Sequence, residues 1–280
     1  MRKISTLMVS VLCMMMPVGA EAQVPTAFVS KGATDIQAQP HTVTQTNSGA
    51  QWAPIDPMVR SITMDNGLPS NAVRSVVQGS KGYMWFGTDN GLCRFDGYDV
   101  KTYYNPFTTV DQFVSALTAC EEGLLVGCNN GAYLFCNATD RFQKLSDKIT
   151  APVLNFSLDG DQNIWISTNG QGVFRYNRTT HELHQYPMKN IQGKVQSTLV
   201  DANNQVWMLC NHGGASIYHL NKSTDQFEAF PLKGDATMFY GMAMLAAPDG
   251  NLYVGTWENG LYKLNADGSA EQLISGTLSN

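Results

Sequence analysis

The stretch YMWFGTDNGLCRFDG at residues 83–97 decides the fold. Apolar residues alternate with others on both sides of Asn90-Gly91, which predicts two short β-strands joined by a tight turn. The Asn-Gly pair is typical of a type I′ hairpin, in which both central residues have positive φ. With its flanks, the stretch predicts four strands, A to D in chain order, over 73–78, 83–88, 92–95 and 99–104.

The same phrase returns four more times along the chain. The later copies read LLVGCNNGAYLFCNA from 124, NIWISTNGQGVFRYN from 163, QVWMLCNHGGASIYHLN from 205 and NLYVGTWENGLYKLNADG from 251. The aligned large apolar residues, spaced by 40, 40, 42 and 46 positions, are Trp85, Leu125, Trp165, Trp207 and Tyr253. A period of about 40 residues made of short strands is typical of β-propeller blades.

A single four-stranded blade cannot bury both of its faces, so the blades must stack on one another. The sequence therefore predicts an all-β propeller with five blades that begin near residues 73, 114, 153, 195 and 241. We expect the repeated Trp85-type residue to be core, because a position repeated in every blade belongs to the scaffold. Gly87, Gly127 and Gly255 follow it, where we expect neighbouring backbone to pass closely.

The residues before the repeat predict an exported chain. Arg2 and Lys3 precede an apolar run that ends in the small residues Ala20 and Ala22. This is the order of a secretory signal peptide over residues 1–22, cleaved after Ala22. Residues 23–57, rich in Gln, Thr, Ala and Pro, predict an unstructured arm before the blades at 58–280. The rest of the chain has no apolar run of about 18 residues, so we expect an exported protein without a membrane span.

Charge and cysteine content exclude several classes of function. The formal net charge of −5 gives no footprint for nucleic acid. No CxxC pair occurs, and removal of the signal peptide leaves an odd number of cysteines. We therefore expect small buried hydrophobic residues rather than disulfides, and no metal or cofactor. The five are Cys93, Cys120, Cys128, Cys136 and Cys210.

Residues 65–103, DNGLPSNAVRSVVQGSKGYMWFGTDNGLCRFDGYDVKTY, closely resemble the two-component regulator propeller repeat. Five copies cover residues 60–280, and two of them have drifted, with Leu125 in place of Trp and Leu209 in place of Gly. The resemblance implies the periplasmic sensor region of hybrid two-component sensor histidine kinases, many of which recognise polysaccharide fragments. It implies no phosphotransfer residue here, because the chain matches none of the kinase parts of such sensors.

The chain ends on the phrase that opens its first blade. GLPSN at 67–71 leads into the first strand A, and GTLSN stands at 276–280. We expect an N-terminal fragment of a longer sensor, whose complete ring would have seven blades. The alternative is that five blades close on themselves, with VRSITM at 59–64 as the outer strand of the last blade.

Strand direction alternates within a blade, so the B–C turns and D–A connections share one side, called here the B–C side. Sugar sites combine an aromatic platform with amides and carboxylates. Trp257 and Glu258 depart from the repeat and supply two of these groups. For Asn90 and Asn130 a role in the turn is the alternative. The candidate ligand-binding residues are Asn90, Asn130, Gln171, Asn211, His212, Trp257 and Glu258.

The predicted function is that of a periplasmic ligand-sensing propeller that binds an oligosaccharide and lacks its own kinase module. Its expected partners are this ligand and either further copies or downstream sensor domains. One alternative is an exported scaffold for protein interactions. Another is a propeller lyase or hydrolase, which is less favoured because only His212 among the histidines reaches the B–C side.

Overall fold

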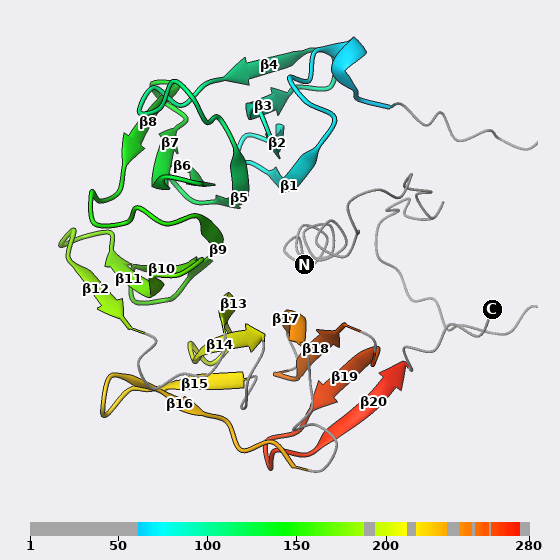
Figure 1. Cartoon of the computed structure of the whole chain (residues 1–280), viewed down its shortest axis with the longest axis vertical. Helices are drawn as coiled ribbons and strands as arrows, with labels where there is room; N and C mark the ends of the chain where they lie inside the picture. Colours follow the sequence, from blue (N-terminus) through cyan, green and yellow to red (C-terminus); the bar gives the residue numbers. More distant parts are fainter. Residues whose placement is uncertain are drawn as a thin grey trace, which may run out of the picture. The chain divides into compact units, whose positions relative to one another are not determined.

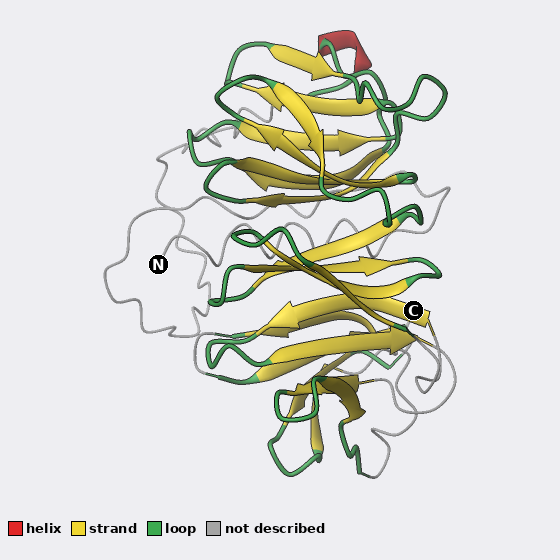
Figure 2. Ribbon diagram, turned by 90° about the vertical axis from the view of Figure 1, so that its left-hand side faces the viewer, coloured by secondary structure: helices red, strands yellow, loops and turns green. Residues whose placement is uncertain are grey.

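The computed structural model describes residues 61–187, 194–211, 217–233, 241–247, 250–257 and 259–274. In these ranges the chain forms five four-stranded antiparallel sheets that follow one another in sequence (Figures 1 and 2). The prediction of an all-β chain of propeller blades is confirmed. The described part also contains one short 3-10 helix, η1 (Met64–Asn66). No helix within it is long and apolar enough to cross a membrane.

Each sheet is a simple up-and-down meander of strands adjacent in sequence. Blade 1 comprises β1 (Val73–Gln78), β2 (Met84–Thr88), β3 (Gly91–Phe95) and β4 (Val100–Tyr103). Blade 2 comprises β5 (Val114–Ala119), β6 (Gly123–Cys128), β7 (Gly131–Cys136) and β8 (Arg141–Lys144). Blade 3 comprises β9 (Val153–Leu158), β10 (Asn163–Thr168), β11 (Gly172–Asn177) and β12 (Leu183–Tyr186). Blade 4 comprises β13 (Lys194–Val200), β14 (Val206–Asn211), β15 (Ile217–Asn221) and β16 (Gln226–Ala229). Blade 5 comprises β17 (Gly241–Ala246), β18 (Leu252–Thr256), β19 (Leu261–Leu264) and β20 (Ala270–Ile274).

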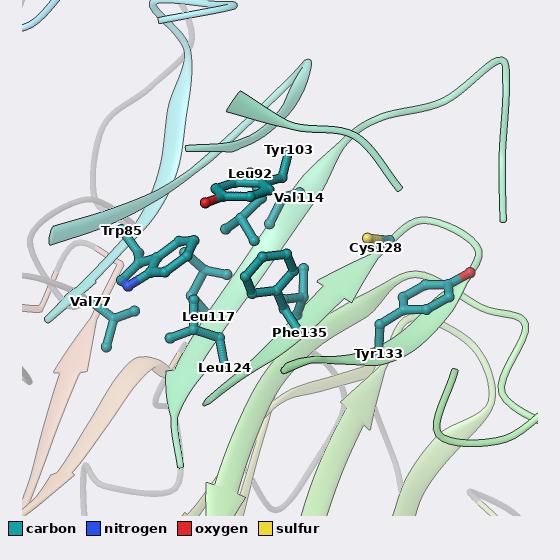
Figure 3. Close-up of a cluster of buried hydrophobic side chains, with 11 residues drawn as sticks. Val77, Trp85, Leu92, Tyr103, Val114, Leu117, Leu124, Cys128, Tyr133 and Phe135 are labelled. Carbon is teal, nitrogen blue, oxygen red and sulfur yellow. The ribbon is translucent and has the colours of Figure 1, made fainter. Parts of the chain in front are cut away.

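The core lies between successive blades. The first strand of each blade contacts the first strand of the next, from β1 to β17. The side chain of Trp85 is only 2% exposed. Its ring lies 5.7 Å from that of Tyr103 and 5.3 Å from that of Phe135 in blade 2 (Figure 3). The expected core role of the repeated tryptophan position is therefore confirmed for this blade, and Leu125 and Trp165 are buried in the same way.

Glycine after the tryptophan position lets neighbouring blades approach closely. A Cβ on Gly87 would lie 2.7 Å from Val114 Cγ1, and one on Gly127 would lie 2.8 Å from Val153 Cγ1. Blade 4 has Leu209 at this position, and the next blade then begins its first strand with Gly241. A Cβ on Gly241 would lie 2.5 Å from Leu209 Cδ1. At the junction between blades 4 and 5 the large residue therefore lies in the earlier blade and the glycine in the later one. The first two junctions have the opposite arrangement.

The B–C hairpins differ from the predicted turn type. Gly91 and Gly131 have positive φ values of 125° and 136°, whereas Asn90 and Asn130 do not have positive φ. A type I′ turn requires positive φ at both central residues, so that prediction was wrong. The reason is the strand register: Thr88 pairs with Gly91, so the two loop residues are Asp89 and Asn90, neither of which has positive φ. The Asn90 N–H donates to Thr88 Oγ1 at 3.1 Å.

The five cysteines of the described part are all free. Four are buried, and Cys136 is partly exposed. Burial raises the pKa of Cys128 and of Cys210 to about 12. A hydrogen bond with Thr139 lowers the pKa of Cys136.

The cysteines are therefore expected to react at very different rates, because the thiolate is the nucleophile. In the folded protein at pH 8, iodoacetamide should alkylate Cys136 well before Cys128 or Cys210, as measured by peptide mass spectrometry over time. Unfolding in urea should equalise the rates. Equal labelling of Cys128 and Cys136 in the folded protein would contradict the buried placement.

Candidate functional site

The B–C side carries the residues proposed from the sequence, at the ends of the second strands of the blades. Asn90, Asn130, Gln171, Asn211 and Trp257 lie in the described part of the chain. His212 and Glu258 lie outside the described residues. The described candidates differ in their hydrogen bonds and in their exposure, so they also differ in the polar groups that they offer to a ligand.

Gln171 is engaged by the connection between blades 2 and 3. Its Oε1 accepts hydrogen bonds from the backbone N–H groups of Thr150 and Ala151, at 2.9 and 2.8 Å. Its Nε2 donates to the carbonyl oxygen of Lys148 at 3.2 Å. These bonds give Gln171 a structural role in holding the connection.

Two asparagines of the B–C side have unsatisfied acceptors. Asn211 Nδ2 donates to Gln196 Oε1 at 2.9 Å. The buried side-chain oxygens of Asn211 and Asn130 have no hydrogen-bond partner among the described residues. A buried acceptor without a partner is costly, so these two oxygens are the B–C positions where a donor from a ligand or water would gain most. Asn90, by contrast, is exposed.

Exposed aromatic residues also lie on the B–C side. The side chain of Trp257, after β18, is 55% exposed. Tyr104 and Phe107, in the connection between blades 1 and 2, are 57% and 51% exposed. The Phe107 ring stacks on Tyr133 with a centroid distance of 5.5 Å. Sequence reasoning missed this connection, although two aromatic residues within a polar loop were a usable signal.

A fixed ion pair lies beside this connection. Arg74 Nε and Nη2 donate to the two carboxylate oxygens of Asp89 at 2.6 and 2.9 Å. The Arg74 guanidinium also lies 5.6 Å from the centre of the Phe113 ring. The hydrogen bond with Asp89 raises the pKa of Arg74. The pair is partly exposed, so it orients the Arg74 side chain and adds little to the stability of the fold.

Two cavities of the described part lie on the opposite side, near the A–B and C–D turns of blade 3, and the second also borders blade 4. One cavity has a volume of about 470 Å³ and a second about 150 Å³, and both are bordered by Asn163 and Arg175. The first is also lined by Asn177, Glu182, Leu183 and His184. The second is also lined by Asp159, Asp161, Trp165, Asn204, Val206, Leu220, Lys222 and Asp225.

An ion pair joins blades 3 and 4 beside the second cavity. Asp225, in the C–D turn of blade 4, accepts hydrogen bonds from Arg175 at 2.9 and 3.1 Å and from the Tyr186 hydroxyl at 2.7 Å. Burial acts to raise the pKa of Asp225, but the bonds from Tyr186 and Arg175 outweigh it and lower the pKa. Asp140 of blade 2 holds Lys101 and Tyr103 of blade 1 in the same way, at 3.1 and 3.0 Å.

Comparison with known proteins identifies the repeat. Residues 67–90 match the family model described as "Two component regulator propeller". This segment of the first blade is therefore similar to that repeat. This propeller chain has no significant match among curated proteins.

Solved structures share the fold of this propeller at low sequence identity. One is the extracellular domain of a protein assigned as the hybrid two component system BT4673 from B. thetaiotaomicron. It is 19% identical, with a TM-score of 0.64, over 75% of this chain and 28% of that one. The corresponding domain of BT3049 from B. thetaiotaomicron is 18% identical, with a TM-score of 0.65, over 77% of this chain and 32% of that one. The propeller chain thus spans about a third or less of each of these two structures.

An enzyme shares the same architecture. Virginiamycin B lyase from Staphylococcus aureus, solved with quinupristin, is 15% identical, with a TM-score of 0.64. The match covers 76% of this chain and 73% of that one. At such identities the likeness concerns the fold alone, because one fold hosts many functions.

Proposed function

We propose that this chain is the ligand-recognition propeller of an exported sensor in two-component signalling, and that its ligand is an oligosaccharide. The regulator propeller repeat at 67–90 supports a sensory role. The structural likeness to extracellular domains of hybrid two-component systems agrees with it. The signal-peptide pattern before Ala22 supports a periplasmic location. Signalling would then require partner domains that receive the conformational change.

The observation that carries the proposed ligand class is the exposed Trp257. It lies on the B–C side with more than half of its surface in solvent. An exposed indole of this kind offers a flat apolar platform for the face of a sugar ring. Asn130 and Asn211 add unsatisfied acceptors on the same side of their blades. Together these groups match the two needs of a saccharide, stacking and hydroxyl hydrogen bonds.

We infer that the propeller acts by binding rather than by catalysis. The described histidines are placed away from the B–C side or packed against rings. His181 Nδ1 lies 2.8 Å from the Tyr176 hydroxyl. His219 lies against Trp207 and Phe230, with centroid distances of 5.9 and 6.3 Å. These contacts favour structural roles over general acid–base chemistry on the B–C side.

The test is oligosaccharide binding by the full chain. We expect Trp257→Ala to weaken binding at least tenfold, because loss of one stacking aromatic removes about 1.4 kcal/mol or more. Isothermal titration calorimetry with soluble fragments of plant and host polysaccharides measures this. Tyr98→Ala is the matched control, since Tyr98 is 82% exposed on the C–D turn of blade 1, on the other side of the blades.

Equal affinity of the wild type and Trp257→Ala for the oligosaccharide would show that Trp257 is not part of the binding site. If the wild-type chain binds none of the oligosaccharides, the proposed ligand class is wrong, and the interaction-scaffold alternative gains. A thermal melt of each variant checks that it remains folded.

A further inference from the structure

The connection between blades 1 and 2, residues 104–113, gathers exposed apolar side chains on the B–C side. In the described ranges eight large hydrophobic residues are exposed, and three of them lie in the first seven positions of this connection. They are Tyr104 and Phe107, each more than half exposed, and Val110, which is 95% exposed. Apolar side chains gathered in this way on one loop indicate an interaction site.

The connection is held in one conformation by its own polar groups. Gln112 Oε1 accepts from the Asn105 backbone N–H at 2.6 Å. Gln112 Nε2 donates to the carbonyl oxygens of Thr108 and Asn105 at 2.8 and 3.2 Å. Asn105 is only 3% exposed, and its Oδ1 accepts from the Phe107 N–H at 2.9 Å. Because the loop is already ordered, its aromatic side chains lose less conformational entropy when a ligand binds.

The Phe107 ring is supported from behind by a buried ring. It stacks on Tyr133 with the ring centroids 5.5 Å apart and the ring planes 25° from parallel. The Tyr133 side chain is fully buried in blade 2, so it forms a fixed base for Phe107. The exposed part of the Phe107 ring is therefore a rigid apolar platform, which suits the face of a sugar ring.

Tyr104 lies against the B–C turn of blade 1. A Cβ on Gly91 would lie 3.5 Å from Tyr104 Cδ1, so the ring is next to the backbone of that turn. Asn90, the preceding residue of the turn, is exposed. In the ranges that the structure describes, the Asn90 backbone N–H bonds to Thr88 and its side-chain amide has no hydrogen-bond partner. An aromatic ring and an available amide thus occur at the same turn.

Two buried polar atoms close to Phe107 have no hydrogen-bond partner among the described residues, the Tyr133 hydroxyl oxygen and Asn130 Oδ1. Burial raises the pKa of Tyr133, and the nearby side chains of Asn105 and Asn130 act to lower it. Figure 3 shows the Tyr133 hydroxyl at the end of the ring that points away from Trp85. An unpaired buried polar group is costly, so a hydroxyl group between these two atoms would bind favourably. It can accept from the phenol and donate to the amide oxygen.

We propose that the B–C side of blades 1 and 2 holds two sugar rings of the oligosaccharide, one against Phe107 and the other against Tyr104. A hydroxyl of the first sugar would enter at the edge of the Phe107 ring and bridge Asn130 and Tyr133. A hydroxyl of the second sugar would bond to the Asn90 amide. This inference rests on the proposed function, because it assigns further residues to the same class of ligand.

Isothermal titration calorimetry of the full chain with soluble polysaccharide fragments tests the two platforms. Phe107→Ala and Tyr104→Ala are each expected to weaken binding about tenfold. Phe107→Tyr keeps an aromatic ring and should bind like the wild type. Val110→Ala is the matched control in the same loop, because Val110 is more exposed than either ring but is aliphatic, and it should leave the affinity unchanged.

Tyr133→Phe distinguishes a ligand contact from a structural role of the hydroxyl. The substitution removes only an oxygen that has no partner in the described part of the chain, so the melting temperature should not fall. The loss of one hydrogen bond to the ligand should weaken binding about three- to tenfold. A lower melting temperature with unchanged affinity would show that the hydroxyl stabilises the fold, and would overturn its assignment to the site.

The outcomes separate this inference from the proposed function. If the wild type binds a fragment and both Phe107→Ala and Tyr104→Ala bind it equally well, the inference is overturned, whereas weaker binding by Trp257→Ala still supports the proposed function. Equal weakening by Val110→Ala and Phe107→Ala also overturns the inference, since it would indicate apolar docking of the loop instead of stacking on a sugar. If the wild type binds none of the fragments, the ligand class is wrong and both are overturned.

Discussion

Trp165→Ala is expected to lower the free energy of unfolding by about 3–5 kcal/mol, the range for removing a fully buried large aromatic residue. The Trp165 side chain is 1% exposed. Its ring lies 5.5 Å from Tyr186 in the same blade and 6.0 Å from Phe227 in the next. The substitution removes contacts on both sides of one blade junction, so neighbouring blades should not compensate. Urea denaturation followed by circular dichroism measures the change.

The matched control for Trp165→Ala is Trp257→Ala. Trp257 is 55% exposed, so its removal should change the free energy of unfolding by no more than about 0.5 kcal/mol. A similar loss in both variants would contradict the assignment of the repeated tryptophan to the core. It would also weaken the use of Trp257→Ala as a binding variant.

Asp159→Ala is expected to cost about 2–3 kcal/mol, because it leaves a buried donor without its charged partner. The Asp159 carboxylate accepts from the Trp165 indole Nε1 at 2.8 Å. It also accepts from the backbone and side-chain nitrogens of Asn163, both at 2.9 Å. The loss should appear in the same urea denaturation experiment.

A double-mutant cycle isolates the bond to the indole. In the background Trp165→Phe, which has no indole N–H, Asp159→Ala should cost clearly less than in the wild type. Asp147→Ala controls for removing a carboxylate, since the Asp147 side chain is 95% exposed, and it should be nearly neutral. Equal costs in both backgrounds would show that the bond to Trp165 does not stabilise the fold.

The hydrogen bond from the tryptophan indole to an aspartate occurs in blade 3 and again in blade 4. In blade 4, Trp207 Nε1 donates to Asp201 at 2.9 Å. Blade 1 has Gly79 at the aspartate position, where a Cβ would lie 2.7 Å from Trp85 Nε1. A glycine there lets the indole approach the backbone, so the same tryptophan is positioned by two different means. Sequence comparison between copies shows the exchange, but only the structure shows what it does.

The sequence by itself determined the strands, the blades and the core position that Trp85, Leu125 and Trp165 occupy. Strand alternation and turn residues act over a few neighbouring positions, so the pattern of β2 and β3 could be predicted from residues 83–97 alone. The turn type was wrong because it depends on backbone angles of single residues, and positive φ lies at Gly91 rather than Asn90. Within the candidate site, the exposure of Trp257 agreed with its departure from the repeat.

Only the tertiary structure decided which polar side chains meet. Asn204 reaches Asp161, and Asp225 reaches Arg175, across separations of 43 and 50 residues. Such contacts depend on the register of two sheets and on side-chain size at their junction, which no local pattern encodes.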